Sequence, residues 1–529
     1  MQTDFDLIVI GGGINGAGIA RDGAMRGLRV LLLEMDDFGS GTSSWSSRLI
    51  HGGLRYLEHA EIALVYESLH DRRALFRTAA HLVRPLRLHI PIYRDARRGP
   101  WLIKLGMLAY DLLSFGKRLP SHRMLSRKQT MKSFPGLDDD GLRGAASYYD
   151  GQVEYAERLV VENILSAVAA GAVTQNYCEV TRIHIEATSV GAVHWTNRLT
   201  GQNDCASAPV VVNATGPWVD RLLDTVDGDP FARQMGGTKG SHLVLAPFDG
   251  APTEALYVEA RSDGRPFFIL PWNDQILVGT TDIRDDSAPE DLVMTADEID
   301  YLLAEFNALF PNAGVTREHV RHTYSGLRPL PHQLDGPAGA ITRSHVIRHH
   351  SDVARGLYSI IGGKLTTYRS LADDCLRTIA RDFDWKLTAS KTHVDRLPGA
   401  VELANTAASI QRDWLGERSI EHLLRVYGSR ARDVVALAEA IPPMRDSICD
   451  WSGAIAAEVP FAMRFEQAKT LEDVINRRTM IGLGPDRGVS SFDCIADLFA
   501  AEAGLSVEER DAMVAELRST TERRFQVAA

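Results

Sequence analysis

The first 34 residues alternate between short apolar runs and glycine-rich or polar segments. An apolar run at 6–10 leads into the glycine cluster at 11–16 and a helical pattern, and a second apolar run at 29–33 ends in Glu34. This order predicts a strand, a tight turn, a helix and a second strand with an acid at its end, as a dinucleotide-binding fold requires. We therefore expect an α/β chain with a Rossmann-like domain at its start.

Each glycine of this turn has a physical role. Gly11 allows the tight turn, Gly13 lets the backbone approach a pyrophosphate, and Gly16 lets the helix pack closely on the strand. The phosphates then lie at the N-terminus of the helix that starts near Ile14, where free N–H groups favour anions. The carboxylate of Glu34 is placed to accept hydrogen bonds from ribose hydroxyls and to repel a 2′-phosphate.

Two features favour FAD over NAD. The fold begins at residue 5, and the second strand is followed by a hydroxyl-rich loop at 39–47 that can supply further phosphate and ring contacts. The alternative interpretation of this loop is a surface linker, because serine-rich loops commonly have that role.

The apolar and polar alternation returns in the middle of the chain. A helical run at 156–171 precedes strand-like runs at 174–185, 192–196 and 209–213. Later short runs with strand character precede an acidic helix at 297–310.

From about residue 393 helical periodicity takes over, with helix starts predicted at Thr470 and Ser506. The expected domains are a discontinuous FAD-binding domain (1–92, 148–225 and 325–385), a mostly antiparallel β substrate domain (226–324, with 93–147 as a helical insertion) and an all-helical C-terminal domain (393–529).

Composition and charge narrow the function classes. The chain has 529 residues, enough for two or three domains, and a net charge of −11, which gives no nucleic-acid footprint. Its five cysteines are scattered, so we expect free thiols in a reducing compartment and no metal site. We also expect no signal peptide and no spanning helix. The apolar segment 101–113, flanked by basic residues, fits either a helix packed on its domain or an interfacial membrane helix.

Eight ordered motifs carry a family resemblance: GGGINGAG (11–18), GTSS (41–44), LIHGGLRYLE (49–58), NATGPW (213–218), KGSH (239–242), GTTD (279–282), YSGLRP (324–329) and GGKLTTY (362–368). Together they closely resemble the FAD-dependent (aerobic, respiratory) glycerol-3-phosphate dehydrogenase family, from residue 5 to about residue 375 and more weakly beyond. The resemblance implies oxidation of sn-glycerol 3-phosphate to dihydroxyacetone phosphate, with electrons passing to a quinone. It also implies a cytoplasmic homodimer peripherally associated with the inner face of the cytoplasmic membrane.

A phosphorylated substrate requires cations, and arginine binds its oxygens in bidentate fashion. The candidates within or near the motifs are Arg55, Arg328, Arg343 and Lys364. Lys364 follows two glycines, and a helix is expected to begin near Leu365. This places an ammonium and a helix N-terminus where both stabilise negative charge on the flavin ring.

The proton acceptor is predicted from side-chain chemistry. His242 is the first candidate because histidine titrates closest to neutral pH, and His51 is the second. Tyr56 is expected to shape the substrate pocket, and Asp263 and Thr366 to orient partners.

The predicted cofactor-binding residues are Gly11, Gly13, Ile14, Asn15, Gly16, Glu34, Thr42, Ser43, Ser44, Ser47, Leu49, His51, Gly52, Gly53, Leu54, Val180, Ala214, Thr215, Gly216, Trp218, Gly326, Arg328, Gly363, Lys364, Leu365 and Thr366.

Several alternatives stay open. The sequence departs from the family pattern at 149–158 and at 397–400, which leaves room for another polyol phosphate such as a tetritol phosphate. An oxidase using O₂ shares the same chemistry. An amine oxidoreductase of the same fold needs no phosphate site, and a flavin-binding regulator without turnover would not need the cations and the base.

Overall fold

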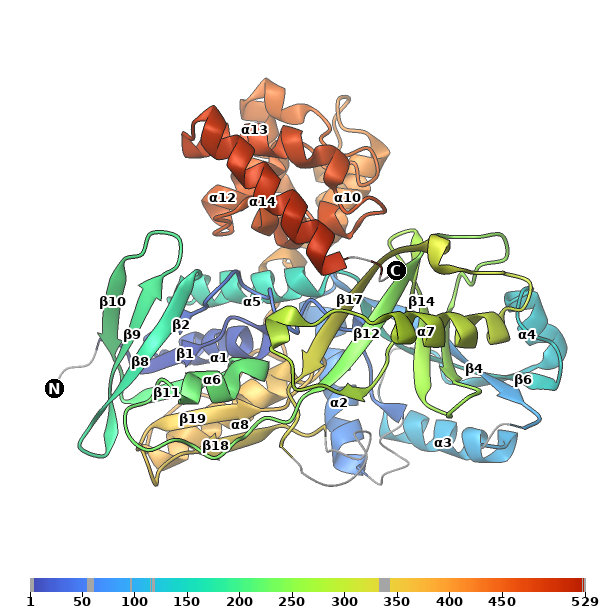
Figure 1. Ribbon diagram of the computed structural model, residues 1–529, viewed down its shortest axis with the longest axis horizontal. Helices are drawn as coiled ribbons and strands as arrows, with labels where there is room; N and C mark the ends of the chain where they lie inside the picture. Colours follow the sequence, from blue (N-terminus) through green and yellow to red (C-terminus); the bar gives the residue numbers. More distant parts are fainter. Residues whose placement is uncertain are drawn as a thin grey trace.

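The computed structural model describes residues 4–54, 61–95, 98–114, 116, 119–332, 343–525 and 527. Arg55 and Tyr56, both predicted to contact substrate, lie outside the described residues. Figure 1 shows two sheet-containing regions side by side with a helical domain above them.

The first region is built on a six-stranded sheet of order β18-β19-β11-β1-β2-β7. Its strands are β1 (Leu7–Ile10), β2 (Val30–Leu33), β7 (Val173–Gln175), β11 (Val210–Asn213), β18 (Val346–His349) and β19 (Leu357–Ile361). All neighbours are parallel except β18, which pairs antiparallel with β19. The central strands are continuous apolar runs because both faces of the sheet are covered.

Alternate residues of β1 enter two different cores. Leu7 and Val9 pack against helices α1 (Ile14–Met25), α5 (Ala156–Ala169) and α8 (Tyr368–Asp382). Ile8 and Ile10 pack against the antiparallel sheet of β8 (Cys178–Glu186), β9 (Ser189–Asn197) and β10 (Asn203–Ser207). A helical layer and a β layer thus enclose the parallel sheet (Figure 1), which confirms the predicted Rossmann-like fold.

A ten-stranded, mostly antiparallel sheet forms the second region, in the order β16-β12-β15-β14-β13-β4-β6-β3, with β17 paired to β12 and β5 to β6. Its strands are β3 (Leu49–Ile50), β4 (Val83–Tyr93), β5 (Arg123–Ser126), β6 (Leu142–Val153), β12 (Thr238–Leu245), β13 (Ala255–Glu259), β14 (Pro266–Trp272), β15 (Gln275–Gly279), β16 (Ile283–Arg284) and β17 (Val320–Arg328). Helix α7 (Ala296–Leu309) packs on one face of it.

The expected helical insertion at 93–147 is wrong in part. It contains α3 (Pro100–Leu113) and α4 (Arg127–Ser133), but also β5 and half of β6. The pair β4–β6 runs in register from Val83↔Val153 to Tyr93↔Leu142, so the expected boundaries at 92 and 148 cut through it. The glycines and alanines of β6 gave no alternating pattern from which this strand could be predicted.

The C-terminal domain is helical, as predicted. Its α-helices are α9 (Thr406–Ile410), α10 (Glu417–Tyr427), α11 (Ala431–Ala440), α12 (Glu458–Phe465), α13 (Phe492–Ala503) and α14 (Val507–Phe525). The helix expected from Thr470 is a π-helix over Asp473–Arg478. Two further α-helices among the described residues are α2 (Ile62–Thr78) and α6 (Val219–Leu223). Within the described ranges, no helix has the length and apolarity needed to cross a membrane.

Candidate active site

A cavity of about 1090 Å³, called the central cavity below, lies where the parallel sheet, the second sheet and the C-terminal domain meet. Its volume is slightly above the roughly 300–1,000 Å³ that is usual for ligand pockets. Among the predicted cofactor residues, those lining it are Gly11, Gly13, Ile14, Asn15, Glu34, Thr42, Ser43, Val180, Ala214, Thr215, Gly216, Trp218, Gly326, Gly363, Lys364 and Leu365. Five of the eight motifs, those at 11–18, 41–44, 213–218, 324–329 and 362–368, thus contribute residues to one cavity.

The glycine turn at the end of β1 admits no side chains at two positions. A Cβ on Gly11, which has φ +107°, would lie 2.6 Å from Ala214 O, and a Cβ on Gly16 would lie 1.8 Å from Gly11 O. Gly13 is the N-cap of α1 and supplies no side-chain cap, and Ile14 N donates to Ser43 Oγ at 3.0 Å. Helix N–H groups beside a cavity form the donor set that a pyrophosphate needs.

Glu34 lies in this wall at the end of β2. One carboxylate oxygen accepts from Gly12 N at 2.6 Å, and the other accepts from Asp36 N at 2.9 Å. Burial raises the pKa of Glu34 to about 7, although both hydrogen bonds oppose the shift. The acid is thus fixed by backbone groups at the edge of the cavity.

A second glycine turn forms the facing wall, after β19. Gly362 (φ +82°) and Gly363 (φ +93°) adopt the left-handed conformation that favours glycine. A Cβ on Gly363 would lie 2.7 Å from Asn15 Nδ2, and Asn15 Oδ1 is buried with no hydrogen-bond partner among the described residues. A buried, unpaired acceptor in the cavity wall fits a bound ligand that donates to it.

The helix predicted to begin near Leu365 begins three residues later, at Tyr368. Thr367 N donates to Lys364 O at 3.1 Å, so residues 364–367 form a turn. Lys364 Nζ donates to Ser68 Oγ at 2.9 Å. Burial lowers the pKa of Lys364 to about 8, while the carboxylates of Glu67 and Glu61 oppose the shift.

Ten predicted cofactor residues are not among those that line the central cavity: Gly16, Ser44, Ser47, Leu49, His51, Gly52, Gly53, Leu54, Arg328 and Thr366. Several of them support the wall from behind. Ser44 Oγ donates to Gly39 O at 2.6 Å, and His51 N donates to Thr366 Oγ1 at 3.2 Å. The predicted second base, His51, has its pKa lowered to about 4, chiefly by burial.

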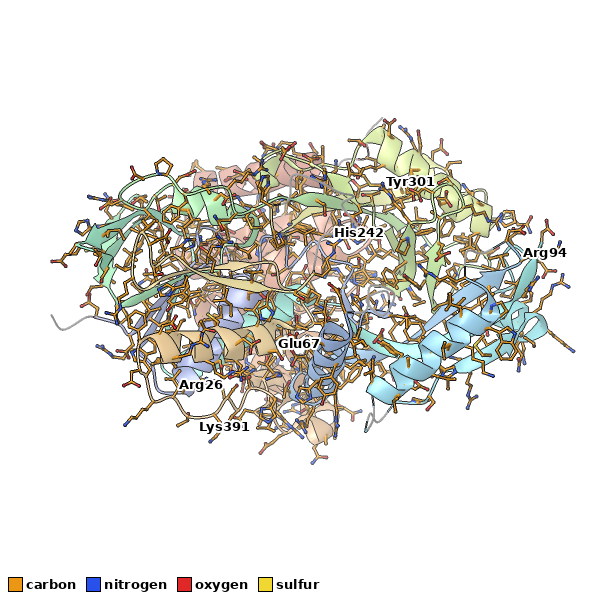
Figure 2. All side chains as sticks on the ribbon, turned by 90° about the horizontal axis from the view of Figure 1, so that it is seen from below. Arg26, Glu67, Arg94, His242, Tyr301 and Lys391 are labelled. Atoms are coloured by element: carbon orange, nitrogen blue, oxygen red, sulfur yellow. The ribbon has the colours of Figure 1, made fainter. Side chains whose placement is uncertain are left out.

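Strands β12 and β17 carry two of the predicted substrate residues, His242 and Arg328, neither of which is among the residues that line the central cavity. They pair with His242 opposite Tyr324 and Thr238 opposite Arg328, and Tyr324 to Leu327 line the cavity. Figure 2 labels His242 well inside the outline of the molecule. The opposite face of β12 is held by α7, because Ser241 Oγ donates to Glu298 Oε1 at 2.8 Å.

His242 is buried and has defined neighbours. Its Nε2 lies 2.8 Å from Ser47 Oγ, and its ring stacks on Tyr324 with centroids 4.7 Å apart. Burial, followed by the charge of Arg328, lowers the pKa of His242 to about 3. The near-neutral pKa on which the sequence argument rested is therefore wrong. The imidazole is unprotonated at neutral pH, as a proton acceptor must be.

Two of the predicted arginines converge on one carboxylate. Arg328 Nη1 donates to Asp282 Oδ1 at 3.0 Å, and Arg343 Nη2 donates to Asp282 Oδ2 at 3.4 Å. Gly240 makes room for this arrangement, because a Cβ there would lie 2.3 Å from Arg328 Nη2. Arg343 lies in the segment before β18.

Asp263 lies on the β13–β14 turn, away from the residues that line the cavity. Its carboxylate accepts from Arg265 N at 2.9 Å and from Tyr301 OH at 3.1 Å.

Sequence reasoning missed a third wall of the central cavity, which the C-terminal domain provides: Met463, Ala468, Lys469, Thr470, Leu471, Glu472, Arg477, Phe499, Met513, Leu517, Thr520 and Arg524 are among its members. The capping pattern at Thr470 predicted a helix start there, but no local motif marks these residues as cofactor contacts.

A dinucleotide fold whose helix N-terminus opens on a large cavity, with Lys364 in the cavity wall, is typical of an FAD-dependent oxidoreductase. Residues 6–369 match the family described as FAD dependent oxidoreductase, and residues 390–510 match the C-terminal domain of alpha-glycerophosphate oxidase. The chain belongs to the FAD-dependent glycerol-3-phosphate dehydrogenase family, and its cofactor is FAD.

Individual relatives support this assignment. The chain is 46% identical to a glycerol-3-phosphate dehydrogenase from Synechocystis sp. over 97% of this chain and 95% of that one. It is 38% identical to a D-erythritol 1-phosphate dehydrogenase from Brucella abortus, over 90% and 94% of the two chains. A glycerol-3-phosphate dehydrogenase from Bacillus halodurans, solved with FAD, superposes with a TM-score of 0.78 at 28% identity and covers 99% and 96% of the two chains.

Among the described residues, no group of three or more histidine, cysteine or acidic side chains is placed to hold a metal ion.

Proposed function

We propose that this enzyme oxidises sn-glycerol 3-phosphate to dihydroxyacetone phosphate and passes the electrons to a quinone. The observation that carries the substrate assignment is the convergence of Arg328 and Arg343 on Asp282 beside the neutral His242. Two guanidinium groups within reach of one another suit the oxygens of a phosphate. An amine substrate would not need them.

The residues divide the work as follows. When bound, FAD supplies the hydride acceptor for the carbinol hydrogen. Arg328 and Arg343 hold the substrate phosphate and thereby fix the carbinol carbon in place. His242 takes the hydroxyl proton at Nε2, where the substrate hydroxyl replaces Ser47 Oγ, which lies 2.8 Å from that nitrogen in the structure. Lys364 places a positive charge in the cavity wall, where it favours negative charge on the bound ring.

The Arg328→Ala variant tests the substrate class. A phosphate substrate should lose about 2–4 kcal/mol of transition-state binding, because a charged partner is left unpaired. Steady-state kinetics with a soluble electron acceptor measure kcat/KM for sn-glycerol 3-phosphate, for a tetritol phosphate and for glycine. Unchanged efficiency in the variant would contradict the phosphate site. Higher wild-type efficiency with the tetritol phosphate would move the assignment to that substrate.

The quinone assignment requires access to a bilayer, and helix α3 offers an apolar surface for it. Trp101, Leu105 and Leu112 are 76%, 64% and 75% exposed, whereas Met107 and Tyr110 are buried on the opposite face. In Figure 1, α3 lies along the edge of the molecule opposite the C-terminal domain.

Basic side chains accompany this surface. Lys104 Nζ lies 5.4 Å from the centroid of the Trp101 ring, and the exposed Arg94, labelled in Figure 2, precedes the helix. An apolar face bordered by cations fits the headgroup region of an anionic bilayer, where tryptophan is favoured. We propose that α3 docks the enzyme peripherally on the cytoplasmic membrane.

Sedimentation with anionic phospholipid vesicles tests this docking. The double variant Leu105→Glu/Leu112→Glu should stay in the supernatant, while Val507→Glu, at a 71% exposed position in the C-terminal domain, should sediment like the wild type. Equal sedimentation of all three proteins would refute the role of α3.

The electron acceptor is tested separately. Measuring quinone reduction and O₂ consumption in the same vesicles distinguishes a dehydrogenase, which reduces the quinone, from an oxidase, which consumes O₂. The homodimer that the family resemblance implies stays a prediction, which mass measurement in solution tests.

A further inference from the structure

The loop after β2 is joined to the C-terminal domain by a buried cluster of charged side chains. Asp37 is fully buried and accepts two hydrogen bonds from Arg478, Nη1 at 2.7 Å and Nη2 at 2.8 Å. Arg477 Nε adds a third at 2.6 Å. These two cations hold the pKa of Asp37 at about 2, below its usual value, even though burial opposes the shift. The carboxylate is therefore charged and fully paired.

The π-helix over Asp473–Arg478 makes this geometry possible. Neighbouring residues of an α-helix point in different directions, so consecutive side chains do not usually meet the same partner. Here Arg477 and Arg478 are consecutive, and both reach the carboxylate of Asp37. Single π-helical turns are rare in proteins, and many of those that occur lie at functional sites.

The cluster continues into the wall of the central cavity. Arg477 Nη2 donates to Asp473 Oδ1 at 2.7 Å, and Tyr177 OH donates to the same oxygen at 2.7 Å. Arg477 and Arg524 of α14 both donate to Glu472 Oε1, at 3.0 Å and 2.6 Å. The members of this cluster that line the central cavity are Asp37, Tyr177, Glu472, Arg477 and Arg524.

The position of the cluster along the cavity indicates which part of the cofactor it meets. Asp37 lies three residues beyond Glu34, the acid at the end of β2, where a dinucleotide fold holds its ribose. The loop that follows, with Gly39 to Ser43, lines the same cavity and reaches the glycine turn through Ser43. Whatever fixes Asp37 therefore fixes the wall around the adenosine half of FAD.

We propose that the helical C-terminal domain is a clamp on the adenosine end of FAD, and that Asp37, Arg477 and Arg478 are the positioning residues that couple the docking of this domain to cofactor affinity. The coupling is reciprocal: a docked domain tightens FAD binding, and bound FAD stabilises docking. The proposal depends on FAD and not on the substrate or the electron acceptor. A failed substrate assignment therefore leaves it intact.

The chain contains a matched control for this idea. Arg158 of α5 binds Glu466 of the C-terminal domain through two hydrogen bonds, at 2.5 Å and 2.9 Å, and both side chains are buried. This pair also joins the two domains, but neither residue lines the central cavity. Arg430 also binds Glu466, which keeps that carboxylate paired if Arg158 is replaced.

The experiment measures FAD affinity directly. Full-length wild type and the variants Asp37→Asn, Arg478→Gln and Arg158→Gln are stripped of cofactor and titrated with FAD, with quenching of flavin fluorescence as the readout. We expect Asp37→Asn and Arg478→Gln to raise the Kd about tenfold or more, and Arg158→Gln to change it by less than about threefold. The increase in thermal midpoint that FAD confers should fall in the first two variants.

A gentler variant covers the case in which a buried replacement prevents folding. Arg524 is 39% exposed and lines the cavity, so Arg524→Ala should fold and still weaken FAD binding by about threefold or more. FAD affinities of Asp37→Asn, Arg478→Gln and Arg524→Ala all close to the wild-type value would overturn the proposal. A loss of FAD affinity in Arg158→Gln as large as that in Asp37→Asn would also overturn the proposal. Domain docking in general, and not this cluster, would then govern FAD affinity.

Discussion

Replacing Gly240 by alanine tests the placement of the substrate arginine without removing any charge. The new Cβ would lie 2.3 Å from Arg328 Nη2 and 2.6 Å from Thr280 Oγ1, whereas an ordinary contact begins at 3.4 Å. The guanidinium must therefore move by about 1 Å, which is enough to cost about 10²-fold in rate at a reacting centre. This loss in kcat/KM corresponds to about 2.7 kcal/mol.

The assay is steady-state oxidation of sn-glycerol 3-phosphate with a soluble electron acceptor. Flavin absorbance of each purified protein shows that cofactor content is unchanged. The control is Gly416→Ala, where a Cβ meets nothing within 4 Å. We expect Gly416→Ala to match the wild type. If Gly240→Ala stays within about threefold of the wild type, the position of the Arg328 guanidinium does not govern catalysis and the reasoning is refuted.

Two further predictions concern protons. His242→Gln should lower kcat by about 10²–10⁴-fold with little change in KM, because it removes the proton acceptor and leaves the arginines in place; a loss confined to KM would contradict this role. Since the pKa of Lys364 is about 8, its ammonium is present below that pH and lost above it, so kcat/KM should fall as pH rises through about 8. Lys364→Arg keeps its charge at all accessible pH and should lack this decline; the same decline in that variant would assign it to another group.

The nucleotide half of the site could be predicted because steric limits leave a local signature. Only glycine fits at Gly11 and Gly16, where a Cβ would collide with the backbone, and the strand and helix around them have strong periodicity. For the same reason the Gly362–Gly363 turn was recognisable, since both residues have positive φ. The helix after this turn starts later than expected because residues 364–367 turn before Tyr368 begins the helix.

The rest of the site depends on contacts between distant segments. Asp37 meets Arg477 and Arg478 across more than four hundred residues of sequence, and a buried ion pair imposes no periodicity on either segment. The pKa of His242 is another example, because it depends on burial between β12, β17 and the loop at Ser47. Side-chain type alone suggested a base whose pKa lies near neutral pH. Burial in the fold instead lowers the pKa of His242 to about 3.

The most direct test of the central claim is an anaerobic absorbance spectrum of the purified protein before and after addition of sn-glycerol 3-phosphate. The account predicts an oxidised-flavin band that bleaches on addition of this substrate. A band that persists with glycerol phosphate but bleaches with a longer polyol phosphate would contradict the proposed substrate. A flavin band that neither compound bleaches would contradict the proposed oxidation of a polyol phosphate altogether.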